Sequence, residues 1–207
     1  MAQGVTLAGD VLGGTAPERA KAYVDYLNNN VNLVQSRLAN LPESQRPSVV
    51  HIPSFPPLTV DGGGSTQGGL WINTAGGRSE FSDQEGTYIT VSAEELLERN
   101  PDVLVIQAPR EDASGQSVVA ALAEQLPVWN ELKAVQNNRV YLNPRGMYPW
   151  ERSTPEQALQ VLWAAKTLHP DLFADIDMRA EARNFYNEFF NYSPTDADLD
   201  EIFQVNP

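Results

Sequence analysis

The longest regular pattern of apolar and polar positions lies between residues 17 and 40. Apolar side chains recur there every three or four residues, which is the spacing of one face of an α-helix. They are Ala20, Tyr23, Tyr26, Leu27, Val31, Val34 and Leu38. Thr15, Pro17 and Glu18 have the spacing of a capping box with a proline in the first turn. The pattern predicts a helix of roughly 35 Å, at 1.5 Å per residue, a length that suits a spine or a connector.

Short apolar runs alternate with helical patterns after residue 47. Strands are predicted at 48–52, 87–92, 102–109 and 138–144. Helices are predicted at 69–77, 92–100, 115–135 with a break near Pro127, 153–170, 178–190 and 193–203. Ser92 and Ser153 are the expected N-caps of two of these helices. The alternation predicts an α/β fold: a three-layer, Rossmann-like lobe with a mainly parallel sheet, preceded by the long helix.

The loops that follow the predicted strands are the first place to look for a ligand site. In parallel sheets, ligands gather at the carboxyl ends of the strands. Three loops meet this condition, at 53–69, 109–115 and 144–152. The last of them belongs to the segment "NPRGMYPWERSTP" at 143–155, which combines two arginines and two large aromatic residues with three prolines and a glycine.

Two interpretations of this segment are open. Arg145 and Arg152 could hold an anionic ligand with forked hydrogen bonds, while Tyr148 and Trp150 pack against its faces. Alternatively, the tryptophan fills space beneath a helix, and the arginines form ion pairs with the glutamates at 151 and 156. The residue types alone do not separate the two.

Composition and charge exclude several classes of function. The chain has 207 residues, of which 42% are hydrophobic, enough for one domain, with or without an extension. Lys and Arg total 14 against 27 Asp and Glu, and the net charge of −13 argues against nucleic-acid binding. Cysteine is absent, which excludes disulfides and thiolate metal sites. The two histidines, His51 and His169, are expected to cap or pack, so we predict neither a metal site nor a cofactor.

Other motifs point only weakly to chemistry. The glycine run at 62–64 lacks the lysine of a phosphate-binding P-loop. The acidic residues at 196–201 lack the central glycine of a calcium loop. A small α/β hydrolase or transferase using the glycine loop and Asp61 is one alternative function, although no nucleophile–base pair stands out. A protein-interaction module built on the aromatic loop is another.

Targeting signals are also missing from the pattern. Nothing is apolar for long enough to span a membrane, and the first residues lack the charged and apolar regions of a secretory signal. We therefore expect either a cytoplasmic protein or a piece of a longer one.

Four segments, taken together, resemble one family. They are "LWINTAGG" at 70–77, "TVSAEELLERNPDVLVI" at 90–106, "WNELKAVQNNRVYLNP" at 129–144 and "YPWERSTPEQALQVLWAAKTLHPDLF" at 148–173. The chain resembles the helical-backbone (class III) substrate-binding proteins of ABC importers, which take up siderophores, haem, cobalamin and some oxyanions. Those proteins have two α/β lobes joined by one long helix, with the ligand held between the lobes.

The resemblance implies a division of the chain. Residues 1–45 would be the end of a first lobe and the backbone helix, and residues 46–207 the C-terminal ligand-binding lobe with a helical tail. The rest of the first lobe and the export signal would not be in this chain. A bare lobe would expose the surface that normally meets its neighbour, so self-association is expected.

The resemblance also implies a function and its residues. The chain would be a non-enzymatic, periplasmic or otherwise extracytoplasmic component that binds a metal complex of the iron–siderophore, haem or corrinoid class and presents it to the permease. The implied ligand-facing residues are Tyr88, Tyr148, Trp150 and Arg152, to which the reading of the loop adds Arg145. Glu94 would be the surface carboxylate that docks onto basic residues of the permease.

Overall fold

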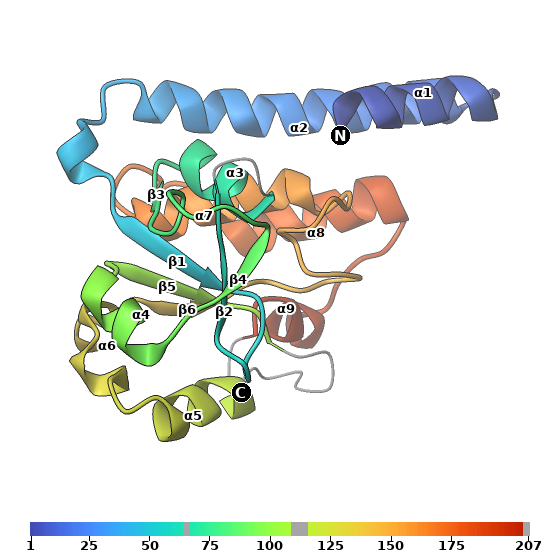
Figure 1. The fold of residues 1–207 in the computed structure, drawn as a ribbon. Helices are drawn as coiled ribbons and strands as arrows, with labels where there is room; N and C mark the ends of the chain where they lie inside the picture. Colours follow the sequence, from blue (N-terminus) through green and yellow to red (C-terminus); the bar gives the residue numbers. More distant parts are fainter. Residues whose placement is uncertain (64–66, 109–115, 205–207) are drawn as a thin grey trace.

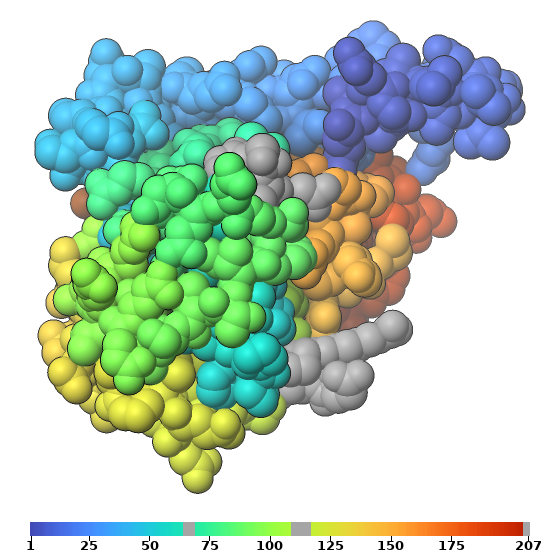
Figure 2. All heavy atoms as spheres, in the orientation of Figure 1, coloured from blue at the N-terminus to red at the C-terminus, as the bar shows by residue number. Residues whose placement is uncertain are grey.

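Two helices form a rod that lies across an α/β lobe (Figure 1). The computed structural model describes residues 1–63, 67–108 and 116–204. Helices α1 (Ala2–Leu12) and α2 (Ala16–Leu38) run side by side as a hairpin. A Cβ on Gly9 would lie 2.7 Å from the Cβ of Ala20, so the two helices approach closely because α1 has a glycine there. Figure 2 shows that the rod overhangs the lobe at its α1 end.

The predicted long helix is confirmed as α2, but its predicted capping box is wrong. Thr15 stands at the N-cap, yet its side chain makes no capping hydrogen bond to the described residues. Its φ and ψ of −89° and −2° are helical, whereas a capping side chain needs the extended backbone typical of an N-cap. Helix α1 was not predicted from the sequence.

The main sheet has four parallel strands in the order β3-β1-β5-β6. Their bounds are Arg78–Ser79 for β3, Ser48–Ile52 for β1, Val103–Ile106 for β5 and Val140–Leu142 for β6. Alternate residues of the central strands face opposite sides: Val103 and Val105 belong to one core, and Leu104 and Ile106 to the other. The parallel α/β fold expected from the alternation of elements is therefore confirmed.

Helices cover both faces of this sheet. One core lies between the sheet and α3 (Gln67–Thr74), α7 (Gln157–Leu168) and α8 (Met178–Phe190), with α2 packed outside them. The other lies beneath α4 (Ala93–Arg99), α5 (Gln116–Gln125) and α6 (Lys133–Gln136). Short 3-10 turns at Glu43–Gln45 and Trp129–Glu131, and helix α9 (Asp196–Ile202), complete the described elements. Ser92 caps α4 as predicted, whereas α7 begins later than predicted, with Glu156 rather than Ser153 at its N-cap.

A small second sheet corrects the expected pairing of one strand. Strand β4 (Tyr88–Thr90) pairs antiparallel with β2 (Thr59–Asp61), which lies inside the predicted loop 53–69. The two sheets are joined by a buried contact of 2.7 Å between His51 Nδ1 on β1 and Asp61 Oδ2 on β2. This contact satisfies one atom of each buried side chain, while His51 Nε2 and Asp61 Oδ1 have no hydrogen-bond partner among the described residues.

Polar contacts fix α2 on the lobe. Asn30 is buried and donates to the carbonyl oxygen of Ala158 over 2.8 Å, and the Tyr23 hydroxyl donates to the carbonyl oxygen of Pro155 over 3.0 Å. Arg37 forms a forked pair with Asp175 near the other end. The helix is thus held at several points along its length.

The rod also carries exposed apolar side chains. Leu7, Val11 and Leu12 of α1 are all exposed. Self-association through this face stays a prediction. Among the helices that the structure describes, none combines the length and the apolar character needed to cross a membrane.

The buried contact of Asn30 can be tested by removal. Asn30→Ala leaves the carbonyl group of Ala158 without its donor and is expected to lower the free energy of unfolding by about 1–2 kcal/mol. Asn29→Ala is the matched control, because Asn29 is exposed on the same helix and alanine is the better helix former. Urea unfolding of both variants measures the difference. Equal stabilities would show that the contact contributes nothing.

The two histidines are expected to titrate in opposite directions. Burial disfavours the imidazolium of His51, but the charge and hydrogen bond of Asp61 outweigh it and raise the pKa of His51. Burial, with nearby Arg139 and Arg46, lowers the pKa of His169, although the carbonyl oxygen of Gly76 opposes this. Proton NMR of the two imidazoles against pH should place one midpoint above and one below about 6.5.

The raised pKa of His51 makes the stability of the fold depend on pH. The contribution of His51 to the free energy of unfolding is fully present below about pH 6.5, and it is lost as the pH rises through the raised pKa of the folded state. Asp61→Asn should remove that loss and bring the His51 midpoint below 6.5, since burial then outweighs the smaller effect of the Glu151 charge, which Arg152 opposes. An unchanged midpoint in this variant would show that Asp61 is not the cause.

Candidate functional site

The predicted aromatic segment forms a tight hairpin directly after β6. We call residues 144–150 the ligand hairpin. Its ends are closed by a hydrogen bond of 3.1 Å from the Trp150 amide to the carbonyl oxygen of Pro144. Arg145 and Pro149 face each other inside it as an isolated antiparallel bridge. The hairpin is therefore closed by backbone contacts between its two arms.

A buried carboxylate holds the tip of the hairpin through hydrogen bonds. Glu156, at the N-cap of α7, accepts the Met147 amide over 2.8 Å and the Tyr148 amide over 3.2 Å. The hydroxyl of Tyr186 on α8 donates to the same carboxylate. Burial raises the pKa of Glu156, although these hydrogen bonds act in the opposite direction. Sequence reasoning considered Glu156 as a partner for the arginines and as part of the predicted cap at Ser153, and it missed this contact.

A small cleft opens at the carboxyl ends of the strands, as predicted. Its volume is about 250 Å³. It is lined by Pro53, Ser54 and Phe55 after β1, Gln107 and Ala108 after β5, and Arg145, Tyr148, Pro149 and Arg152 from the hairpin and the turn that follows. Two of the three predicted loops thus meet here. The third, at 109–115, lies outside the described residues.

The two predicted arginines differ in their partners. Arg152 Nε lies 3.0 Å from Glu151 Oε1, and its guanidinium also donates to the Tyr88 hydroxyl and lies over the Tyr88 ring, 5.2 Å from its centre. The predicted interpretation of an arginine paired with Glu151 is therefore observed for this residue. Arg145 lines the same cleft, and its guanidinium has no ion pair or hydrogen bond with any residue that the structure describes.

Trp150 is not part of the cleft wall. Its side chain is 0% exposed, and its ring packs edge-on against Phe203, 5.4 Å between centres. The expectation that it faces a ligand is wrong in this structure, and the alternative that it fills the interior is observed. The reason is the position of each residue in the hairpin: Tyr148 lies at the tip and is 55% exposed, whereas Trp150 lies at the closed end, where its ring packs against the lobe.

Buried amide side chains form a hydrogen-bonded set next to Glu151, the partner of Arg152. Asn143 donates to Glu151 Oε2 over 2.7 Å and accepts from Gln160 over 2.8 Å. Gln204 donates to the carbonyl oxygen of Asn143 over 2.6 Å. These residues hold the carboxylate that orients Arg152. Sequence reasoning missed this set, although Asn143 directly after a strand was a usable signal.

The remaining candidates lie apart from this network. Glu94 is exposed in the first turn of α4, and its role in docking stays a prediction. Neither histidine belongs to a cluster that could hold a metal ion, and the described parts of the chain contain no such cluster.

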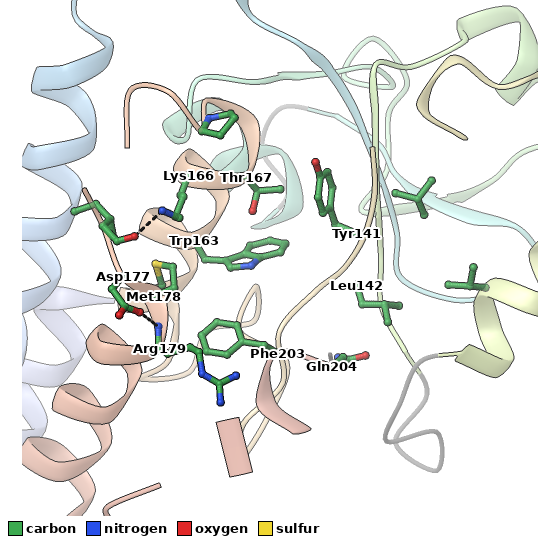
Figure 3. Close-up of a pocket in the computed structure, with 14 residues that line it drawn as sticks. Tyr141, Leu142, Trp163, Lys166, Thr167, Asp177, Met178, Arg179, Phe203 and Gln204 are labelled. Carbon is green, nitrogen blue, oxygen red and sulfur yellow. Dashed lines mark hydrogen bonds between the residues drawn. The ribbon is translucent and has the colours of Figure 1, made fainter. Parts of the chain in front are cut away.

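A larger cavity beside β6 is less suited to a specific ligand. Its volume is about 900 Å³, and Figure 3 shows Trp163 at its centre, between Tyr141 and Phe203. Its charged groups are already engaged: Lys166 donates to two carbonyl oxygens, and Arg179 pairs with Asp200 over 2.6 Å. The smaller cleft is therefore the better candidate site, because it offers Arg145, whose guanidinium has no partner among the residues that the structure describes.

Known proteins resemble this chain in sequence and in fold. Residues 6–145 match the periplasmic binding protein family. The molybdate-binding protein MolA of Haemophilus influenzae is 29% identical over 171 residues, 81% of this chain and 46% of that protein. The high-affinity heme uptake system protein IsdE of Staphylococcus aureus is 26% identical over 123 residues, 58% of this chain and 42% of that protein. The chain thus spans less than half the length of these two relatives.

A solved structure extends the match over nearly the whole chain. The periplasmic solute binding protein from Veillonella parvula superposes with a TM-score of 0.82 at 28% identity, covering 99% of this chain and 60% of that one. The expected family is thereby confirmed. The chain belongs to the periplasmic binding protein family, within the class III group that its sequence resembles.

Proposed function

We propose that this chain is the ligand-binding lobe of an extracytoplasmic substrate-binding component of an ABC importer, and that it binds an anionic metal compound. Membership of the family supports the general role. The names of two relatives, one a molybdate-binding protein and one a heme uptake protein, support a metal-containing ligand. The residues of the cleft support the negative charge of that ligand.

The guanidinium of Arg145 is the observation that carries this proposal. Arg145 lines the strand-end cleft beside Arg152 and Tyr148, and its guanidinium has no carboxylate partner among the described residues. In a protein with a net charge of −13, an arginine that no described residue neutralises makes a concave site locally positive. Forked donation to an oxyanion or a carboxylate would complete its hydrogen bonding.

The size of the cleft bears on the class of ligand. Its volume of about 250 Å³ is below the roughly 300–1,000 Å³ typical of pockets for drug-sized molecules. A compact oxyanion suits this wall better than the iron–siderophore, haem or corrinoid complexes that the resemblance implies. Molybdate is therefore the first probe, and haem represents the larger class.

The enzyme alternative has little support from the geometry. It relied on Asp61, which is 4% exposed and bonded to His51, itself 1% exposed. A substrate cannot reach either group in this arrangement. The protein-interaction alternative would be favoured if neither molybdate nor haem bound.

The role of Arg145 predicts a specific loss of affinity. In calorimetric titration of the full 207-residue chain, Arg145→Ala should weaken molybdate binding by about tenfold or more, since a hydrogen bond to a charged group contributes roughly 1.5–3 kcal/mol. Arg78→Ala is the control, because it removes one positive charge from an exposed position on β3. Equal affinities of wild type and Arg145→Ala would contradict the assigned cleft.

Arg152→Ala should behave differently from Arg145→Ala. It leaves the buried carboxylate of Glu151 without its cation, so we expect the free energy of unfolding to fall by about 1–3 kcal/mol in addition to any loss of binding. Chemical unfolding monitored by tryptophan fluorescence measures this. A stability equal to that of Arg145→Ala would mean that the pair with Glu151 is not structural.

We also propose that Glu94 contacts the permease. It is an exposed carboxylate on a short, well-capped helix, and such a charge can orient a partner electrostatically. When the chain is added to a reconstituted permease, Glu94→Lys should reduce ligand-stimulated ATP hydrolysis while leaving ligand affinity unchanged. Glu98→Lys on the same helix is the control. Equal effects of the two reversals would argue against a specific contact.

A further inference from the structure

The ligand hairpin depends on two buried side chains that do not face the cleft. We infer that Glu156, together with Tyr186, is a positioning residue that sets the orientation of Arg145 and Tyr148 for ligand binding. What the hairpin binds rests on the proposed function, whereas how the hairpin is held follows from the contacts within this chain.

Both oxygens of the Glu156 carboxylate are used at the tip. Oε1 accepts the amide of Met147 and the hydroxyl of Tyr186, and Oε2 accepts the amide of Tyr148. Because these two amides point inward, the side chains that they carry turn outward, at 67% and 55% exposed. The direction of the tip therefore follows from the position of one carboxylate, which is itself 0% exposed.

The glycine at the tip makes room for this carboxylate. A Cβ on Gly146 would lie 1.9 Å from Glu156 Oε1 and 1.9 Å from the Tyr186 hydroxyl oxygen, far inside van der Waals contact. No other residue fits at this position without moving the hairpin or expelling the carboxylate. The glycine, the carboxylate and the phenol are thus mutually dependent.

Few other contacts hold the hairpin on this side. A groove of about 470 Å³ separates it from α8 and α9, lined by Arg145, Gly146 and Met147 on one wall and by residues such as Phe190 and Tyr192 on the other. Across the groove, the Arg145 amide donates to the carbonyl oxygen of Ile202 over 2.8 Å. Since side-chain packing is incomplete here, the orientation of the tip depends on a small number of hydrogen bonds.

The segment that carries Glu156 also contacts the long helix α2. Glu156 lies between Pro155 and Ala158, whose carbonyl oxygens accept hydrogen bonds from Tyr23 and Asn30 of α2. The segment 155–158 is therefore fixed by α2 on one side and fastens the hairpin on the other. Glu156 therefore lies on a segment that is itself held in place, as a positioning residue requires.

The first experiment needs no ligand. Amide exchange followed by NMR should show the amides of Met147 and Tyr148 protected in the wild type, and Glu156→Gln should speed their exchange by about tenfold or more, because glutamine offers one acceptor oxygen for two amides. Tyr186→Phe should give a smaller increase, since it leaves both amide bonds in place. Unchanged exchange in Glu156→Gln would overturn the inference.

The second experiment measures molybdate affinity of the full chain. Tyr186→Phe should weaken binding about threefold to tenfold, less than Arg145→Ala, because the lost hydrogen bond acts on the ligand only through Glu156. Tyr26→Phe is the matched control, because the Tyr26 hydroxyl contacts Glu181 instead of the hairpin carboxylate. Thermal unfolding of both variants separates positioning from general destabilisation. Equal affinity of Tyr186→Phe and wild type would contradict the inference.

The two proposals can fail separately. If the wild type binds neither molybdate nor haem, the proposed ligand class is wrong, and the exchange rates still decide whether Glu156 holds the hairpin. If the wild type binds molybdate and Arg145→Ala does not, but Glu156→Gln binds like the wild type, the cleft is correct and the positioning role is wrong.

Discussion

Parallel pairing of β1, β5 and β6 is the constraint on which the candidate site depends. Because these strands run in one direction, the segments that leave them must emerge at the same edge of the sheet. Residues 53–55, residues 107–108 and four residues of the third segment are far apart in the chain, yet together they line one cleft; the four are Arg145, Tyr148, Pro149 and Arg152. An antiparallel arrangement would send alternate segments to opposite edges and would leave no such cleft.

Charge is distributed unequally over this cleft. Arg152 is oriented by Glu151 and Tyr88, and Glu151 in turn is held by Asn143. Because Arg152 is held by these partners, it forms a fixed part of the site, and Glu151 neutralises part of its charge. Arg145 supplies the remaining positive charge, because none of the described residues pairs with its guanidinium. The site thus combines a fixed polar wall with one group that a ligand can satisfy.

The fold was largely predictable from local patterns. Apolar spacing predicted α2, and the alternation of strands and helices predicted the parallel sheet, because both signals lie within a few turns of chain. Strand β2 was missed inside a loop rich in proline and glycine, since its pairing with β4 is a contact between distant segments. The predicted caps of α2 and α7 were wrong for a similar reason: the backbone angles of Thr15 and the start of α7 at Glu156 depend on packing around them.

The residue types of the site were therefore determined by the sequence, and their roles by the tertiary structure. The sequence of the segment 143–155 was enough to predict a turn after a strand that contains arginines and aromatic residues. Only the packed structure buries Trp150, pairs Arg152 with Glu151, leaves Arg145 without a partner among the described residues, and places Glu156 beneath the tip. Local patterns record which side chains are near in the chain, whereas burial and partnership depend on which segments meet in space.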